Sequence, residues 1–104
     1  MIDAGMMRGP RAWSTGPGVF VNAEIHSKQD AVDVLTRYRD HYRTRNIKSY
    51  MIGDRAQRQF MVEAAAELGM MPTTEGASDM VLNLTHAIDG FSGNEHSIPV
   101  SPLR

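Results

Sequence analysis

Short apolar runs alternate along this chain with longer segments that have helical hydrophobic spacing. The clearest strand candidate spans residues 47–51, which are mostly apolar or aromatic. Residues 70–74 form a second one, in which Pro72 fits best at the beginning because proline cannot donate to a sheet ladder. Residues 11–14 and 91–95 are predicted as the first and last strands. The pattern therefore predicts four strands.

The segments between these strands have the apolar spacing of helices. The first helix is predicted to begin after Ser27 and to end near Thr44. The second begins after Asp54, where Gln57 completes a capping-box pattern, and ends at Gly69. The predicted buried stripes are Ala31, Leu35, Tyr38 and Tyr42 in the first helix, and Phe60, Met61, Ala64, Ala65 and Leu68 in the second.

A third helix is predicted between Ser78 or Asp79, either of which can cap it, and Gly90, which ends it. Val81, Leu84 and Ile88 have the spacing of its apolar face. The resulting alternation of strands and helices predicts an α/β fold with parallel strands and helices packed outside them, because parallel strands require crossover connections.

Three residues able to bind metal or move protons lie in or just after the predicted strands. They are Lys48, Glu75 and His96, and the runs that carry them recur roughly every 24 residues, about the length of one β/α unit. In a parallel sheet all strand ends point to the same side. We therefore expect these three side chains to converge on one face, where α/β enzymes place their chemistry.

The composition narrows the possible functions. The 104 residues are enough for one small domain, and a net charge of -1 gives no overall attraction to nucleic acid or to anionic membranes. A basic stretch from Arg37 to Lys48 is interpreted as a solvated helix face in preference to a phosphate-binding patch. No apolar run is long enough to cross a bilayer, and residues 1–4 lack the features of a signal peptide. The sequence therefore does not indicate in which cellular compartment the protein lies.

The chain has no cysteine, which excludes disulfides, thiolate nucleophiles and sulfur-ligated metals. Any metal must then be held by histidine, carboxylate or a modified lysine. Lys48 has two interpretations: its ammonium reaches water or a carboxylate, or its neutral amine condenses with CO2 to a carbamate that binds metal. His96 is either a hydrogen-bond partner or a ligand, and Glu75 a ligand, a general base or a helix-capping charge. His26, His41 and His86 are predicted to be surface residues.

Four blocks carry a resemblance to a known family: residues 9–16, 47–50, 74–76 and 90–96. In this order and spacing they resemble the middle of an amidohydrolase-superfamily enzyme, nearest to the imidazolonepropionase-like and prolidase-like hydrolases. The resemblance implies part of a (β/α)8 TIM barrel with one or two divalent metal ions, often zinc. It also implies hydrolysis of amide, peptide or cyclic C–N bonds by metal-activated water.

The resemblance places residues 1–104 as an incomplete domain that holds roughly the third to sixth barrel strands. It puts Lys48 where the fourth-strand lysine is carboxylated in binuclear members, and His96 where the sixth strand offers a metal-binding histidine. Glu75 stands where many members have a histidine, and it would be a metal ligand or a catalytic group. The first-strand His-x-His pair and the last-strand aspartate of the family are absent from this chain.

The resemblance therefore implies a fragment of a metal-dependent hydrolase that acts on a small molecule or a peptide and has little activity alone. Its expected partners are the rest of the barrel or a second copy of the chain. One alternative is a non-catalytic α/β module that binds a protein or itself. A second is a phosphate-handling enzyme that uses the basic stretch 37–48 and the loop 16–18.

Overall fold

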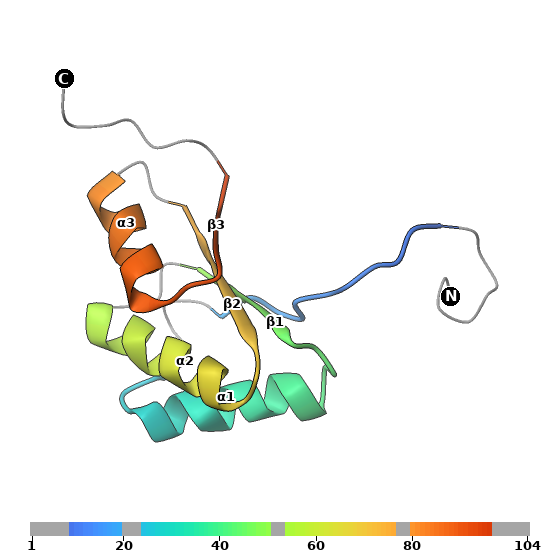
Figure 1. Cartoon of the computed structure of the whole chain (residues 1–104). Helices are drawn as coiled ribbons and strands as arrows, with labels where there is room; N and C mark the ends of the chain where they lie inside the picture. The colour runs from blue at the N-terminus through green and yellow to red at the C-terminus, as the bar shows by residue number, and fades with distance from the viewer. Residues whose placement is uncertain (1–8, 20–23, 51–53, 77–79, 97–104) are drawn as a thin grey trace.

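A computed structural model describes residues 9–19, 24–50, 54–76 and 80–96. In these ranges helices and strands alternate along the chain, and Figure 1 shows the helices lying to one side of the strands. The elements are α1 (Lys28–Asp40), β1 (Asn46–Ser49), α2 (Arg55–Glu67), β2 (Met71–Glu75), α3 (Met80–Asp89) and β3 (Gly93–Glu95).

The three strands form a parallel sheet in the order β1-β2-β3. Lys48 lies opposite Thr73, and Glu75 lies opposite Glu95. The α/β fold with parallel strands predicted from the alternation is therefore confirmed. Pro72 is the second residue of β2, close to the predicted position at the start of that strand.

Capping residues and a glycine explain where α1 and α2 begin and where α2 ends. The Ser27 hydroxyl accepts from the Asp30 N–H at 3.1 Å, and Asp54 and Gln57 form both bonds of a capping box. Gly69, after α2, has a φ of 66°, a left-handed conformation that favours glycine. The predicted cap of the third helix, Ser78 or Asp79, lies outside the described residues.

The core lies between the sheet and the first two helices. Ile25, Leu35, Ile47 and Met61 are fully buried there. The predicted stripes of both helices face this core with one exception. Tyr42 is 48% exposed, because α1 ends at Asp40 and so before that residue.

The strand predicted at residues 11–14 is not present. Instead Val19 forms a parallel bridge with Ser49: its N–H donates to the Lys48 carbonyl at 2.8 Å, and its carbonyl accepts from the Tyr50 N–H at 2.8 Å. The physical reason is burial. Val19 is 2% exposed, whereas Trp13 is 75% exposed, so the apolar surface buried beside β1 is that of Val19 and not that of Trp13.

The apolar face of α3 also differs from the prediction. Val81, Leu84 and Ile88 are 60%, 57% and 78% exposed, while the buried residues of this helix are Asn83 and His86. Polar contacts with the rest of the protein explain why this side of α3 is buried. The Asp89 carboxylate, on that side, accepts from Arg55 at 2.7 Å and from Gln59 at 3.2 Å, and the Asn83 carbonyl accepts from the Asn94 amide at 3.3 Å.

His86 is therefore buried, at 4% exposure, and its prediction as a surface residue was wrong; His26 and His41 are exposed as predicted. Its ring packs edge-on against Phe91 at 5.4 Å between centroids. Burial lowers the pKa of His86, and the positive charge of Arg58 lowers it further.

No helix within the described ranges is long and apolar enough to span a membrane.

A pH-dependent stability follows from His86. Its lowered pKa contributes stability that is complete above the unfolded value of about 6.5 and is lost as the pH falls toward the folded value. We expect urea denaturation to give a free energy of unfolding that falls between neutral pH and pH 5. In His86→Gln this component should disappear, whereas exposed His26→Gln should keep it. An equal pH slope in wild type and His86→Gln would contradict the assignment.

Candidate functional site

Four side chains meet at the carboxyl end of the parallel strands. Lys48 comes from β1, Glu75 from β2, Glu95 from β3, and His96 follows β3 directly. We call these four residues the rim cluster. All three strands run in the same direction, so their last residues lie at one edge of the sheet. The structure thus brings together Lys48, Glu75 and His96, the three residues singled out from the sequence.

Lys48 is the buried centre of the rim cluster. Its side chain is 7% exposed, and its ammonium pairs with Glu95 Oε2 and, at 3.0 Å, with Glu75 Oε2. The ammonium also lies 4.9 Å from the centre of the Tyr50 ring, on the same side of the strand as predicted. Burial disfavours the charged amine, but the two carboxylates outweigh it and raise the pKa of Lys48. Lys48 is therefore an ammonium at neutral pH.

The two carboxylates are held ionised by the same contacts. The hydrogen bond from Lys48 lowers the pKa of Glu95, and the Thr73 hydroxyl, 2.7 Å from Glu95 Oε1, lowers it further. Lys48 also lowers the pKa of Glu75, with a smaller contribution from His96. Two anions therefore flank one buried cation, and the exposed edge of the cluster keeps a negative charge.

Glu75 links Lys48 to His96. His96 Nε2 lies 2.8 Å from Glu75 Oε1, while the imidazole is 61% exposed. Because the carboxylate oxygen accepts, Nε2 carries the proton in the neutral ring, and Nδ1 is left as an acceptor. His96 has a φ of 72°, an uncommon conformation for a residue other than glycine. An imidazole that is held by a carboxylate and presented to solvent has the arrangement of a general base.

Gly76 keeps the ends of β2 and β3 in contact. Its N–H donates to the Glu95 carbonyl at 3.0 Å, and a Cβ at this position would lie too close to that carbonyl for any real contact. Only glycine allows this approach. The close approach positions Glu95 beside Lys48.

Gly76→Ala is therefore expected to be destabilising by about 2 kcal/mol, because the new methyl group must push two backbones apart. The matched control is Gly93→Ala in β3, where a Cβ would meet only the Thr73 methyl group, at an ordinary 3.7 Å. Urea denaturation of both variants measures the difference. Equal losses in the two variants would show that the approach of Gly76 to Glu95 is not tight.

The rim cluster does not fit a divalent metal while Lys48 is charged. In the part of the chain that the structure describes, no group of three His, Cys, Asp or Glu residues could hold a metal ion. The ammonium already takes the place of a cation between the two carboxylates, although Glu75 Oε2 makes no aligned hydrogen bond with it. A carbamate on Lys48 requires the neutral amine. The predicted zinc site and carbamate therefore stay predictions.

Sequence reasoning did not assign a role to Glu95, Thr73 or Tyr50. The available signal was Lys48 itself, because a charged side chain on an apolar strand is stabilised when a neighbouring strand supplies a carboxylate. Glu95 was the acidic residue of the last predicted strand and could supply that carboxylate.

Comparison with protein-family models, curated proteins and solved structures gave no match.

Proposed function

We propose that the rim cluster is the strand-end part of a hydrolase site that acts on C–N bonds in amides, peptides or cyclic amides, and that the sheet is a segment of a (β/α)8 barrel. The resemblance in the sequence motivates the reaction class and the barrel. The observation that carries the proposal is the Glu75–His96 contact of 2.8 Å at the carboxyl edge of parallel strands, next to a buried lysine. This edge is where barrel enzymes place their catalytic groups.

The residues have distinct roles in this proposal. His96 Nδ1 takes a proton from a water molecule that attacks the carbonyl carbon, and it returns that proton to the leaving nitrogen. Glu75 accepts from Nε2, fixes the ring and stabilises the imidazolium that forms. Lys48 holds Glu75 ionised, since it lowers the pKa of that carboxyl group. Lys48 and Glu75 thus act through His96.

A metal-dependent form of this proposal is chemically separate. It requires that the Lys48 ammonium first lose one proton to solvent. The free amine then bonds to CO2, which forms the carbamate and releases a second proton from the nitrogen. A divalent metal such as zinc would supply an activated water there. It predicts that protein prepared in bicarbonate gains the mass of one CO2 and retains zinc, and that Lys48→Ala loses both. Unchanged mass and no zinc would leave only the metal-free form.

The hydrolase proposal is tested with the full chain on a panel of simple amides, dipeptides and cyclic amides, with and without zinc and bicarbonate. We expect slow hydrolysis of at least one class, and a loss of roughly 10²-fold or more in His96→Ala. The matched control is His41→Ala, because His41 is an exposed histidine after α1 and outside the rim cluster. No hydrolysis of any substrate, or equal losses in both variants, would overturn the proposal.

Self-association without catalysis is a second candidate, supported by α3. Its apolar residues Val81, Leu84 and Ile88 are exposed, and β3 is the edge strand of the described sheet. Sedimentation should then show dimers or larger species that Leu84→Glu dissociates. Ala66→Glu, at an exposed position of α2, should not dissociate them. A monomer at all concentrations would exclude this candidate.

A further inference from the structure

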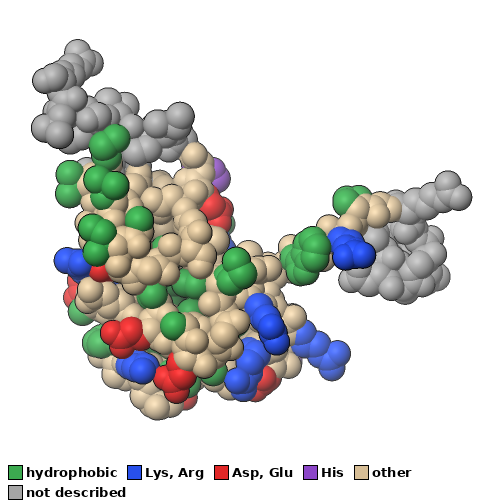
Figure 2. Space-filling view, in the orientation of Figure 1, with side chains coloured by type: hydrophobic (Ala, Val, Ile, Leu, Met, Phe, Trp, Pro, Cys, Tyr) green, Lys and Arg blue, Asp and Glu red, His purple; other side chains and the backbone are tan. Residues whose placement is uncertain are grey.

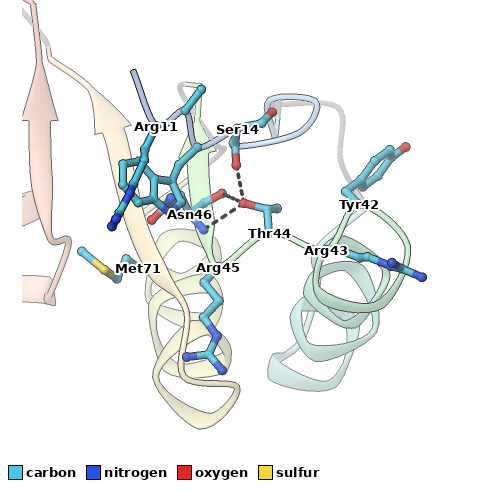
Figure 3. Close-up of a pocket in the computed structure, with 10 residues that line it drawn as sticks. Arg11, Ser14, Tyr42, Arg43, Thr44, Arg45, Asn46 and Met71 are labelled. Carbon is cyan, nitrogen blue, oxygen red and sulfur yellow. Dashed lines mark hydrogen bonds between the residues drawn. The ribbon is translucent and has the colours of Figure 1, made fainter. Parts of the chain in front are cut away.

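A second site lies at the opposite end of the sheet from the rim cluster. A pocket of about 800 Å³ opens beside Asn46 and Met71, the first residues of β1 and β2. The rest of its lining comes from residues 11–14 and 42–45 (Figure 3). The volume is in the range of small-molecule sites. Residues in this pocket have no part in the proposed hydrolase.

The walls of the pocket are held by specific contacts. Thr44 is buried, and its hydroxyl contacts the Ser14 carbonyl and, at 3.1 Å, accepts from the Asn46 N–H (Figure 3). Gly16 packs closely against Tyr42, since a Cβ there would lie 3.4 Å from the Tyr42 side chain. The segment before Gly16 is therefore fastened to the beginning of β1. This fastening places Arg11 and Trp13 on one side of the pocket.

Three arginines surround the pocket. Arg11, Arg43 and Arg45 line it, and none forms an ion pair with any described residue. Other arginines of the chain do have partners: Arg39 pairs with Asp40, and Arg55 with Asp89. Figure 2 shows basic side chains gathered on the face below the extended N-terminal segment. No carboxylate in the described ranges therefore neutralises the positive charge of the pocket.

Large apolar side chains lie beside this charge. Trp13 is 75% exposed, Met71 is 56% exposed, and both line the pocket. An exposed indole offers a flat face on which a planar ring can stack, and guanidinium groups bind phosphate oxygens with two parallel hydrogen bonds. Arg43 adopts a left-handed conformation with a φ of 52°, which turns the chain between Tyr42 and Thr44. Figure 3 shows Arg43 and Arg45 extending outward in different directions from this turn, with Arg11 on the far side of Asn46.

We propose that this pocket binds a planar organic phosphate of nucleotide size, with the ring stacked on Trp13 and the phosphate held by Arg45 together with Arg11 or Arg43. Because these side chains point in different directions (Figure 3), two of them must turn toward one another when the ligand binds. The phosphate-handling alternative raised by the sequence used the stretch 37–48, which groups Lys48 with Arg43 and Arg45. Lys48 instead belongs to the rim cluster at the other end of β1, and the loop 16–18 does not line the pocket. The proposal is independent of the hydrolase, because the two sites share no residue.

Trp13 is the only tryptophan of the chain, so its fluorescence reports directly on the pocket. Titration of the full chain with adenosine 5′-monophosphate at low salt should change this fluorescence in a saturable way, and added salt should weaken binding. We expect Arg45→Ala to weaken binding at least tenfold, and Arg43→Ala or Arg11→Ala to weaken it severalfold. Arg37→Ala, on the exposed side of α1 and outside the pocket, should stay within twofold. Calorimetry provides a second measure of binding, and circular dichroism confirms that each variant is folded.

Adenosine and inorganic phosphate separate the two halves of the recognition. Each should bind at least tenfold more weakly than the monophosphate, because adenosine lacks the anion and inorganic phosphate lacks the ring. The proposal is overturned by the absence of binding at millimolar monophosphate, or by equal weakening in Arg37→Ala and Arg45→Ala. If adenosine bound as tightly as the monophosphate, the arginines would not contribute to binding. If inorganic phosphate bound as tightly as the monophosphate, Trp13 would not contribute.

Discussion

Replacing Lys48 by methionine is expected to lower the free energy of unfolding by about 2 kcal/mol. The substitution keeps most of the apolar stem but leaves Glu75 and Glu95 side by side without their shared cation. Breaking a fully buried pair from one side costs about 3–5 kcal/mol, and the smaller value is expected because the Glu95 side chain is 38% exposed to solvent. Urea denaturation at neutral pH measures the loss. Glu95→Gln in the same background should recover part of it.

The pH dependence of this loss identifies its cause. In the wild type the lowered pKa values of Glu75 and Glu95 contribute stability above the ordinary carboxyl value of 4.5, and this is lost as the pH falls through the lowered values. The raised pKa of Lys48 contributes stability that is lost only as the pH rises past its folded value, above 10.5. Wild type and Lys48→Met should therefore approach each other in acid.

The matched control for Lys48 is Lys28→Met. Lys28 pairs with Glu67 at 3.1 Å between α1 and the end of α2, but both side chains are about half exposed. Such surface pairs contribute little, so this variant should be almost as stable as the wild type. Similar losses in the two variants would show that the burial of Lys48 has no energetic consequence.

The largest expected effect on activity comes from Glu75→Gln, which should reduce the hydrolysis rate by roughly 10²–10⁴-fold. Glutamine has nearly the same shape, but it cannot stabilise an imidazolium at His96 Nε2. Glu95→Gln is the matched comparison, because Glu95 also pairs with Lys48 but is not paired with His96. Its rate should fall much less than that of Glu75→Gln, while both variants lose stability. The pH profile of the rate should be altered in Glu75→Gln and retained in Glu95→Gln.

Two results would contradict this assignment. If both glutamine variants lost the same rate, the effect would come from disruption of the rim cluster and not from the Glu75–His96 contact. If His96→Ala kept the rate that Glu75→Gln loses, Glu75 would act without His96. Substrate affinity and maximal rate should be measured separately, since loss of a general base lowers the maximal rate more than the affinity.

The sheet and the rim cluster were largely predictable because both follow from chain direction. Once β1, β2 and β3 are parallel, Lys48, Glu75 and His96 must lie at one edge, whatever the packing details. The Asp54 capping box and the turn at Gly69 were predictable for a similar reason: each depends on neighbouring residues. Local rules and strand direction account for the correct predictions.

The errors occurred where distant contacts decide the outcome. Periodicity identified an apolar stripe on α3, but the helix turns its other side inward because Asp89 reaches Arg55 and His86 packs on Phe91. The spacing of apolar residues along α3 does not indicate that Arg55 and Phe91 are its partners. A distant contact also explains the error at residues 11–14, which were predicted to form the first strand. Val19, and not that segment, pairs with Ser49 of β1. The pairing of Lys48 with Glu95 joins residues 47 positions apart and depends on the register of β3.

Consecutive order in the sheet also has a consequence for assembly. Each strand pairs with the strand before it in the chain, so a ribosome-bound polypeptide can add β2 to β1 while β3 is still being synthesised. During that interval Glu95 and His96 do not yet exist, and of the two carboxylates that pair with Lys48 in the described structure only Glu75 has been synthesised. Docking of the final strand would then give Lys48 its second carboxylate and assemble the imidazole site in one step.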